Sequence, residues 1–263
     1  MCWKATYLLD NKIATELSKS DYKTHSFMNT EFLLPAFFVL IIAGVIFLQY
    51  YYSRKAVVKR KLKKATGMKI SSFLSGDIAK VAGKVEFVDD PLIAPLSGRR
   101  CAFYYVLVEQ QVSTGKSSHW KKVIEEEVSG TFVIRDGRYR AHISNDSTLK
   151  TYLVQDVQYK SGFYNDATDM LEKYLQTHNM GSENMLGFNK TLRYKEGVLE
   201  EDECIAVVGR GEWKNASEVN LPDSFGKILV LSSTNEEPIY LSDDPDTVEI
   251  TYNGLPEVEA AIK

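Results

Sequence analysis

The clearest feature of the hydrophobic pattern is an uncharged run from Phe32 to Tyr52, which reads FLLPAFFVLIIAGVIFLQYYY. As a helix with a rise of about 1.5 Å per residue, it would be about 31 Å long, which matches the hydrocarbon core of a bilayer. Thirteen of its 21 residues are Phe, Leu, Ile or Val, among them Leu40 and Leu48. The run predicts a transmembrane helix whose closing tyrosines lie at the membrane interface.

Basic residues follow this run directly: Arg54, Lys55, Lys59, Arg60, Lys61, Lys63 and Lys64. By the positive-inside rule, they predict a single-pass membrane protein whose C-terminal part is cytoplasmic. They can serve only as this topology signal, or they can also contact anionic lipid head groups. Residues 54–65 can continue the membrane helix, within a basic juxtamembrane stalk over residues 53–68 that ends near Gly67.

The N-terminal tail, residues 1–31, shows no secretory or lipidation pattern. Met28 lies just before the apolar run. We therefore interpret residues 1–27 as an early start of translation, and we expect the working chain to begin at Met28.

From residue 69 onward the pattern changes to that of strands, and residues 69–263 are expected to form one domain. Runs rich in β-branched and aromatic residues predict strands over 78–88, 101–112, 119–128, 131–134, 138–143, 191–196, 203–212 and 227–231. One amphipathic helix is predicted over 166–178, with Asn165 or Asp166 as its N-cap. The fold class is mainly β, with antiparallel strands in a barrel- or sandwich-like arrangement, preceded by the transmembrane helix.

The charge of this domain limits its partners. The whole chain has a formal net charge of −3, but the part after Lys64 has 21 basic and 31 acidic residues, a net charge of −10. Such an acidic domain argues against nucleic acid as a partner, because phosphate binding needs a basic surface. The partners expected are the lipid bilayer and another protein.

Few residues of the sequence are candidates for catalysis or for binding a metal or cofactor. The four histidines are isolated, so neither a metal nor a cofactor is expected. Cys101 and Cys204 lie in apolar runs, where cysteine usually behaves as a small hydrophobic residue. A Cys101 nucleophile with His119 as its base is the one catalytic pair that the strands could bring together.

Aromatic side chains at strand positions suggest a different kind of site. Some of them must face outward and could form a partner-binding face, although core packing is the alternative for each. They are Tyr104, Tyr105, Trp120, Tyr139 and Trp213.

A series of short motifs resembles the GIDE, or "beside a membrane" (BAM), domain over about residues 73–241. In order, the matching residues are Pro95, Leu96, Ser97, Gly98, Cys101, Tyr104, Glu109, Trp120, Asp136, Gly137, Glu196 and Gly209. Asp136 and Gly137 are also the strongest hairpin signal in the chain.

The resemblance has implications for function. The family includes mitochondrial outer-membrane E3 ubiquitin ligases of the Mulan type, which end in a RING finger. A RING needs eight Cys or His ligands, and this sequence has three cysteines and four histidines. It is more similar to short, single-span bacterial members without a RING, which often accompany LemA-type membrane proteins.

We therefore expect a membrane-tethered, non-catalytic protein-interaction module that binds another protein or a second copy of itself. The alternative is an enzyme, either a ubiquitin transferase, as the family label suggests, or a cofactor-free hydrolase that uses Cys101 and His119.

Overall fold

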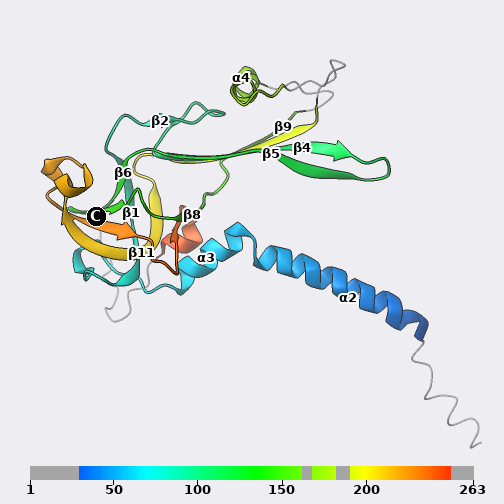
Figure 1. The fold of residues 1–263 in the computed structure, drawn as a ribbon, viewed down its shortest axis with the longest axis horizontal. Coiled ribbons are helices and arrows are strands. Elements are labelled where there is room, and N and C mark those ends of the chain that lie inside the picture. The colour runs from blue at the N-terminus through cyan, green and yellow to red at the C-terminus, as the bar shows by residue number, and fades with distance from the viewer. Residues whose placement is uncertain (1–29, 162–167, 182–189, 250–263) are drawn as a thin grey trace, which may run out of the picture. The chain divides into compact units, whose positions relative to one another are not determined.

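The chain divides into two compact units, residues 1–53 and 54–263, in a computed structural model that describes residues 30–161, 168–181 and 190–249. The first unit contains helix α2 (Thr30–Tyr51; Figure 1). From Leu34 to Tyr51 this helix is long and apolar enough to cross a membrane. From Leu34 onward its large apolar side chains are exposed, including Leu40 and Leu48. The predicted N-terminal apolar helix is thus confirmed, while the predicted early start lies outside the described residues.

Five strands of the second unit close into a barrel (Figure 1). They are β1 (Ile78–Phe87), β6 (Phe132–Asp136), β7 (Tyr139–Ile143), β11 (Cys204–Asn215) and β12 (Lys227–Ser232). Their order is β1-β6-β7-β12-β11, and β11 also pairs with β1. β7 and β12 are parallel, and the other neighbours are antiparallel. This is the Greek-key strand order of OB-fold barrels, and it confirms the mainly β prediction.

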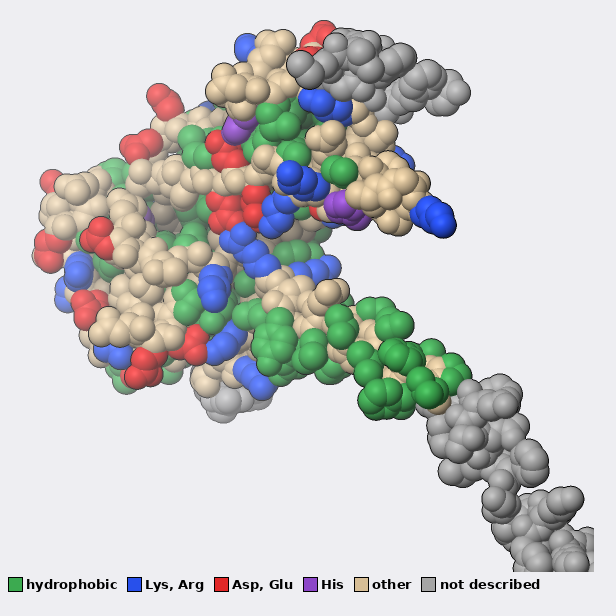
Figure 2. Space-filling view, turned by 45° about the vertical axis from the view of Figure 1, so that its right-hand side comes forward, with side chains coloured by type: hydrophobic (Ala, Val, Ile, Leu, Met, Phe, Trp, Pro, Cys, Tyr) green, Lys and Arg blue, Asp and Glu red, His purple; other side chains and the backbone are tan. Residues whose placement is uncertain are grey.

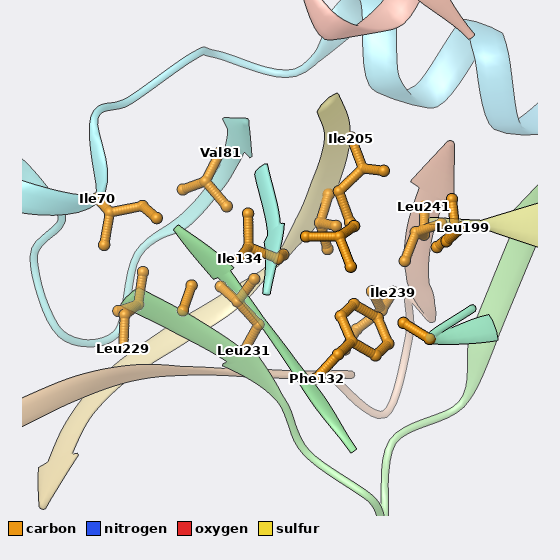
Figure 3. Close-up of a cluster of buried hydrophobic side chains, with 14 of the residues drawn as sticks. Ile70, Val81, Phe132, Ile134, Leu199, Ile205, Leu229, Leu231, Ile239 and Leu241 are labelled. Atoms are coloured by element: carbon orange, nitrogen blue, oxygen red, sulfur yellow. The ribbon is translucent and has the colours of Figure 1, made fainter. Parts of the chain in front are cut away.

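Apolar side chains fill the barrel, as Figure 3 shows for Val81, Phe132, Ile134, Ile205, Leu229 and Leu231 among others. Burying one such side chain stabilises the fold by about 1.5–3 kcal/mol. Close packing also explains a glycine in β11, because a Cβ on Gly211 would lie 2.8 Å from Cδ1 of Leu229. The interior of the barrel therefore has no room for even one extra methyl group at that position.

Two long insertions in the barrel build a second sheet. Its strands are β4 (Phe103–Ser113), β5 (Ser118–Ser129), β9 (Val157–Ser161) and β10 (Leu192–Leu199), in the antiparallel order β5-β4-β10-β9. β4 and β5 come from the insertion between β1 and β6, whereas β9 and β10 come from the insertion between β7 and β11. Helix α4 (Asp169–Thr177) covers one face of this sheet with Leu171, Tyr174 and Leu175. In Figure 1 the β4–β5 hairpin projects beyond the barrel.

Short elements complete the domain. They are β2 (Leu92–Ile93), β3 (Arg100–Cys101), β8 (Leu149–Tyr152), β13 (Ile239–Ser242), α5 (Pro245–Val248) and three 3-10 turns, Ile70–Ser72, Ala216–Val219 and Asp223–Phe225. β13 pairs with β11 and β8.

The basic segment after α2 belongs to the domain. It forms α3 (Arg54–Lys64), in which Val58 and Leu62 are fully buried. These two side chains pack against Ala206 of β11 and Tyr240 of β13. Residues 54–64, the greater part of the stalk predicted over 53–68, therefore form a helix that packs against the domain.

The boundaries of two predicted helices change. Residues 54–65 were expected to continue the membrane helix, but α2 ends at Tyr51 and α3 begins at Arg54. The amphipathic helix begins at Asp169, three residues later than predicted, because the Oγ1 of Thr168 accepts a hydrogen bond from Leu171 N and caps it. The predicted N-caps, Asn165 and Asp166, lie outside the described residues.

Candidate functional site

The most compact part of the sequence motif is the loop between β2 and β3. Gly98 has φ +71°, a backbone conformation that favours glycine, and its N–H donates to the carbonyl oxygen of Ala94. The Leu96 side chain is buried between the second sheet and α4, whereas Pro95 is half-buried. The loop thus links the small β2–β3 hairpin to the helix that covers the second sheet.

A buried carboxylate holds this loop in place. Glu196 of β10 is fully buried, and its Oε1 accepts a hydrogen bond of 2.8 Å from Leu96 N. Its Oε2 has no hydrogen-bond partner among the residues that the structure describes. The loop and Glu196, which lie 100 residues apart in the sequence, therefore form one structural unit.

Arg99, at the end of the loop, links it to residues that flank β9 and β10 of the second sheet. Arg99 Nη2 lies 2.9 Å from Asp156 Oδ2, and its Nη1 lies 3.3 Å from Glu200 Oε2. Its Nε donates to the Oγ of Ser97 at 3.4 Å. These contacts fix the loop by charge as well as by packing.

The predicted catalytic pair is not assembled. Cys101 is fully buried, and burial, together with the nearby charge of Glu196, raises the pKa of its thiol to about 11. His119 is exposed and pairs with Val112 near the far end of the β4–β5 hairpin. Because β4 starts at Phe103, about nine strand residues, or about 30 Å, separate the two positions. Cys101 is a core residue here, as its apolar surroundings predicted, whereas Cys204 is exposed, against the prediction.

The remaining motif residues lie apart from the loop. Gly137 has φ +59° and forms the β6–β7 turn with Asp136 beside it. Gly209 is buried in β11, where a Cβ would lie 3.3 Å from the carbonyl oxygen of Ser232. Tyr104 packs toward α4. These positions have clear structural roles.

Two other motif residues, Glu109 and Trp120, lie on the face of the second sheet opposite α4. We call this surface the open face; it includes Tyr105, Leu107, Glu109, Gln111, Trp120, Lys122, Glu125, Glu127, Lys160, Arg193 and Lys195. Arg54 of α3 contacts this face through an ion pair with Glu127 and a cation–π contact with Tyr105. Figure 2 shows basic and acidic side chains interleaved on this part of the domain.

The centre of the open face is an ordered group of three side chains. Arg193 forms a two-pronged ion pair with Glu109, in which Nη2 lies 3.0 Å from Oε1. The hydrogen bond from Arg193 lowers the pKa of Glu109. The guanidinium carbon of Arg193 also lies 4.3 Å from the centre of the Trp120 ring. An aromatic ring is thus held under a fixed positive charge at a half-buried position.

The predicted cluster of five aromatic residues is divided in the structure. Tyr105 and Trp120 share the open face. Trp213 lies on the barrel, where its Nε1 donates to the carbonyl oxygen of Phe73 at 2.8 Å, and Tyr139 packs against the barrel core. Only two of the five can therefore contribute to one surface.

Three acidic residues near the end of the described chain form ion pairs with lysines of α3. Lys59 Nζ lies 2.7 Å from Asp244 and 2.9 Å from Asp246, and the hydrogen bond to Asp244 raises the pKa of Lys59. Lys61 pairs with Glu237, which lowers the pKa of that carboxyl. Several of the basic residues predicted to mark topology or contact lipid are thus neutralised within the domain.

No protein-family model, curated protein or solved structure matches this chain. The resemblance to the GIDE domain stays a prediction. Within the described part of the chain, no group of three or more His, Cys, Asp or Glu side chains is arranged to hold a metal ion.

Proposed function

We propose that this protein is a membrane-tethered, non-catalytic protein-interaction module, and that the open face is its binding surface. The observation that carries the proposal is the group formed by Trp120, Arg193 and Glu109. A long apolar helix precedes the domain and would hold it at a membrane. The basic residues after that helix favour a cytoplasmic position for the domain.

The composition of the open face suits a protein partner. Trp, Tyr and Arg are enriched among the residues that dominate binding energy at interfaces. Here Arg193 and Trp120 are already held together, so less side-chain entropy is lost when a partner binds. The ion pair of Lys122 with Glu125, at 2.7 Å, adds an alternating charge pattern that can select one partner over another.

The partner is another membrane-associated protein or a second copy of this chain. A LemA-type membrane protein is the candidate that the family resemblance suggests. The hydrolase alternative depends on Cys101 and His119, which the structure separates, so we do not propose it.

Photo-cross-linking from two adjacent residues of β4 tests this proposal. Gln111 lies opposite Trp120 on the open face, whereas Gln110 lies opposite Leu192 and points toward the α4 side. A photoreactive amino acid at Gln111 of the full chain in native membranes should capture a discrete neighbour, and the same amino acid at Gln110 should not. Equal capture from both positions, or none from Gln111, would contradict the proposal.

A pair of aromatic substitutions provides the matched control. Trp120→Ala should reduce the Gln111 cross-link by about tenfold or more, as expected for loss of a central interface residue. Tyr159→Ala removes an exposed aromatic side chain from the opposite face of the same sheet and should leave the cross-link unchanged. The same loss in both variants would show that the open face is not the binding surface.

A further inference from the structure

A cavity of about 380 Å³ lies between α3 and the barrel. Its walls include Arg60, Lys61 and Lys64 from α3 and Arg210 from β11. Its volume lies in the range of small-molecule sites. We propose that this cavity binds the head group of an anionic phospholipid, with the phosphate between Lys64 and Arg210.

The distribution of ion pairs points to these two cations. Lys59 and Lys63 of α3 pair with Asp246, and Lys61 pairs with Glu237 at the cavity wall. In contrast, no acidic partner is recorded for Lys64 or Arg210 among the described residues, and both side chains are exposed. Two basic residues without an acidic partner among the described residues therefore line one cavity, Lys64 from α3 and Arg210 from β11.

The rest of the lining explains why the ligand carries an apolar part. Ile78, which is 53% exposed, contributes to the cavity together with Val208, Pro238 and the ring of Tyr240. A free phosphate ion would leave these apolar groups in contact with water. The glycerol and first acyl carbons of a phospholipid would instead cover them, which is favourable at about 25 cal/mol per Å².

The position of the cavity in the chain agrees with this ligand. α3 begins at Arg54, two residues after the apolar run ends at Tyr52. A helix of 11 residues is about 16 Å long, so the chain itself keeps Lys64 within reach of the membrane surface. Anionic lipids give the cytoplasmic membrane surface a negative potential, which attracts basic residues held close to it.

Retention of lipid by the full chain tests this inference. The protein is reconstituted in nanodiscs of phosphatidylcholine and phosphatidylglycerol, and bound phosphatidylglycerol is measured by native mass spectrometry after release. The double variant Lys64→Gln/Arg210→Gln should weaken retention by about 30-fold, which corresponds to about 2 kcal/mol for two charges. Retention equal to that of the unchanged protein would overturn the proposal.

Two controls test whether the loss of lipid is specific to the cavity. Lys55→Gln/Arg138→Gln also removes two charges, one on α3 closer to the span in sequence and one in the β6–β7 turn, and should retain the lipid. An equal loss of bound lipid in this control would show that the overall positive charge attracts the lipid and that the cavity is not a specific site. Displacement of the lipid by excess inorganic phosphate would assign the cavity to free phosphate, and would overturn the proposal as well. Thermal unfolding of each variant confirms that the fold is intact.

Discussion

The backbone N–H of Leu96 donates to Oε1 of Glu196 at 2.8 Å, and this bond joins the two insertions of the barrel. Leu96 belongs to the insertion after β1, and Glu196 belongs to the insertion after β7. The second sheet needs both insertions, because each contributes two of its four strands. A single buried carboxylate thus helps to position the hairpin that carries the open face.

Replacement of Glu196 should therefore destabilise the domain. Glu196→Ala leaves the buried N–H of Leu96 without its acceptor and opens a cavity, so we expect a loss of about 3 kcal/mol in the free energy of unfolding. Glu196→Gln keeps an acceptor oxygen and should cost less than the alanine variant. Urea unfolding of the full chain in nanodiscs, followed by tryptophan fluorescence, measures both. A Glu196→Ala variant as stable as the unchanged protein would refute the role of this bond.

The two cysteines of the domain should differ sharply in reactivity. Cys204 is exposed, whereas Cys101 is buried with its pKa raised to about 11. In a Cys2→Ser background, a membrane-impermeant maleimide should label Cys204 at pH 7.5 but should label Cys101 only after denaturation. In intact cells, Cys204 should become labelled only after permeabilisation, because we expect the domain to be cytoplasmic. Labelling of Cys204 in intact cells would reverse the proposed orientation.

The buried carboxyl of Asp243 should make stability depend on pH. Burial raises the pKa of Asp243 to about 7, and the charge of Glu203 adds to this, although the N–H of Val154 donates to the carboxyl. Because the folded-state pKa lies above the unfolded value, the folded state binds the proton more tightly. Stability is therefore fully present below about pH 4 and is lost as the pH rises toward 7.

The variant Asp243→Asn isolates this effect. It should remove a pH-dependent loss on the order of 2–4 kcal/mol between pH 4 and 7, while its amide oxygen still accepts from Val154. Parallel unfolding curves at several pH values, compared between the variant and the unchanged protein, provide the measurement. A difference that does not change with pH would show that Asp243 titrates normally.

Much of the fold could be predicted from local patterns. The long apolar helix α2 follows from 21 uncharged residues, and the β6–β7 hairpin follows from Asp136 and Gly137. β8, β9 and β13 could not be predicted. β8 and β13 have only four residues each, and β9 (Val157–Ser161) is mostly exposed, so none has a clear alternation. Their structure depends on pairing with strands that are distant in the sequence, and the local residue pattern does not indicate those pairings.

The open face could also not be predicted from local sequence patterns alone. Trp120 and Glu109 belong to the sequence motif, but no local pattern indicates that Arg193 is their partner. β5 and β10 lie on opposite sides of β4, so the contact between Trp120 and Arg193 depends on the registers of two strand pairs. The sequence indicates that aromatic residues could face outward, but only the sheet order shows which of them share a face with an ion pair.

The ion pairs between α3 and residues far along the chain also have a consequence for the order of events during protein synthesis. Lys59 is paired with Asp246, which follows it by 187 residues. At about 5–20 residues per second, the ribosome needs about 10–40 s to reach that partner. During this interval Lys59 lacks its acidic partners, so its charge would be available to orient the neighbouring apolar segment if that segment enters a bilayer. The same charge can thus act twice, first as an insertion signal and later, once α5 has been synthesised, in the ion pairs that hold α3 against the folded domain.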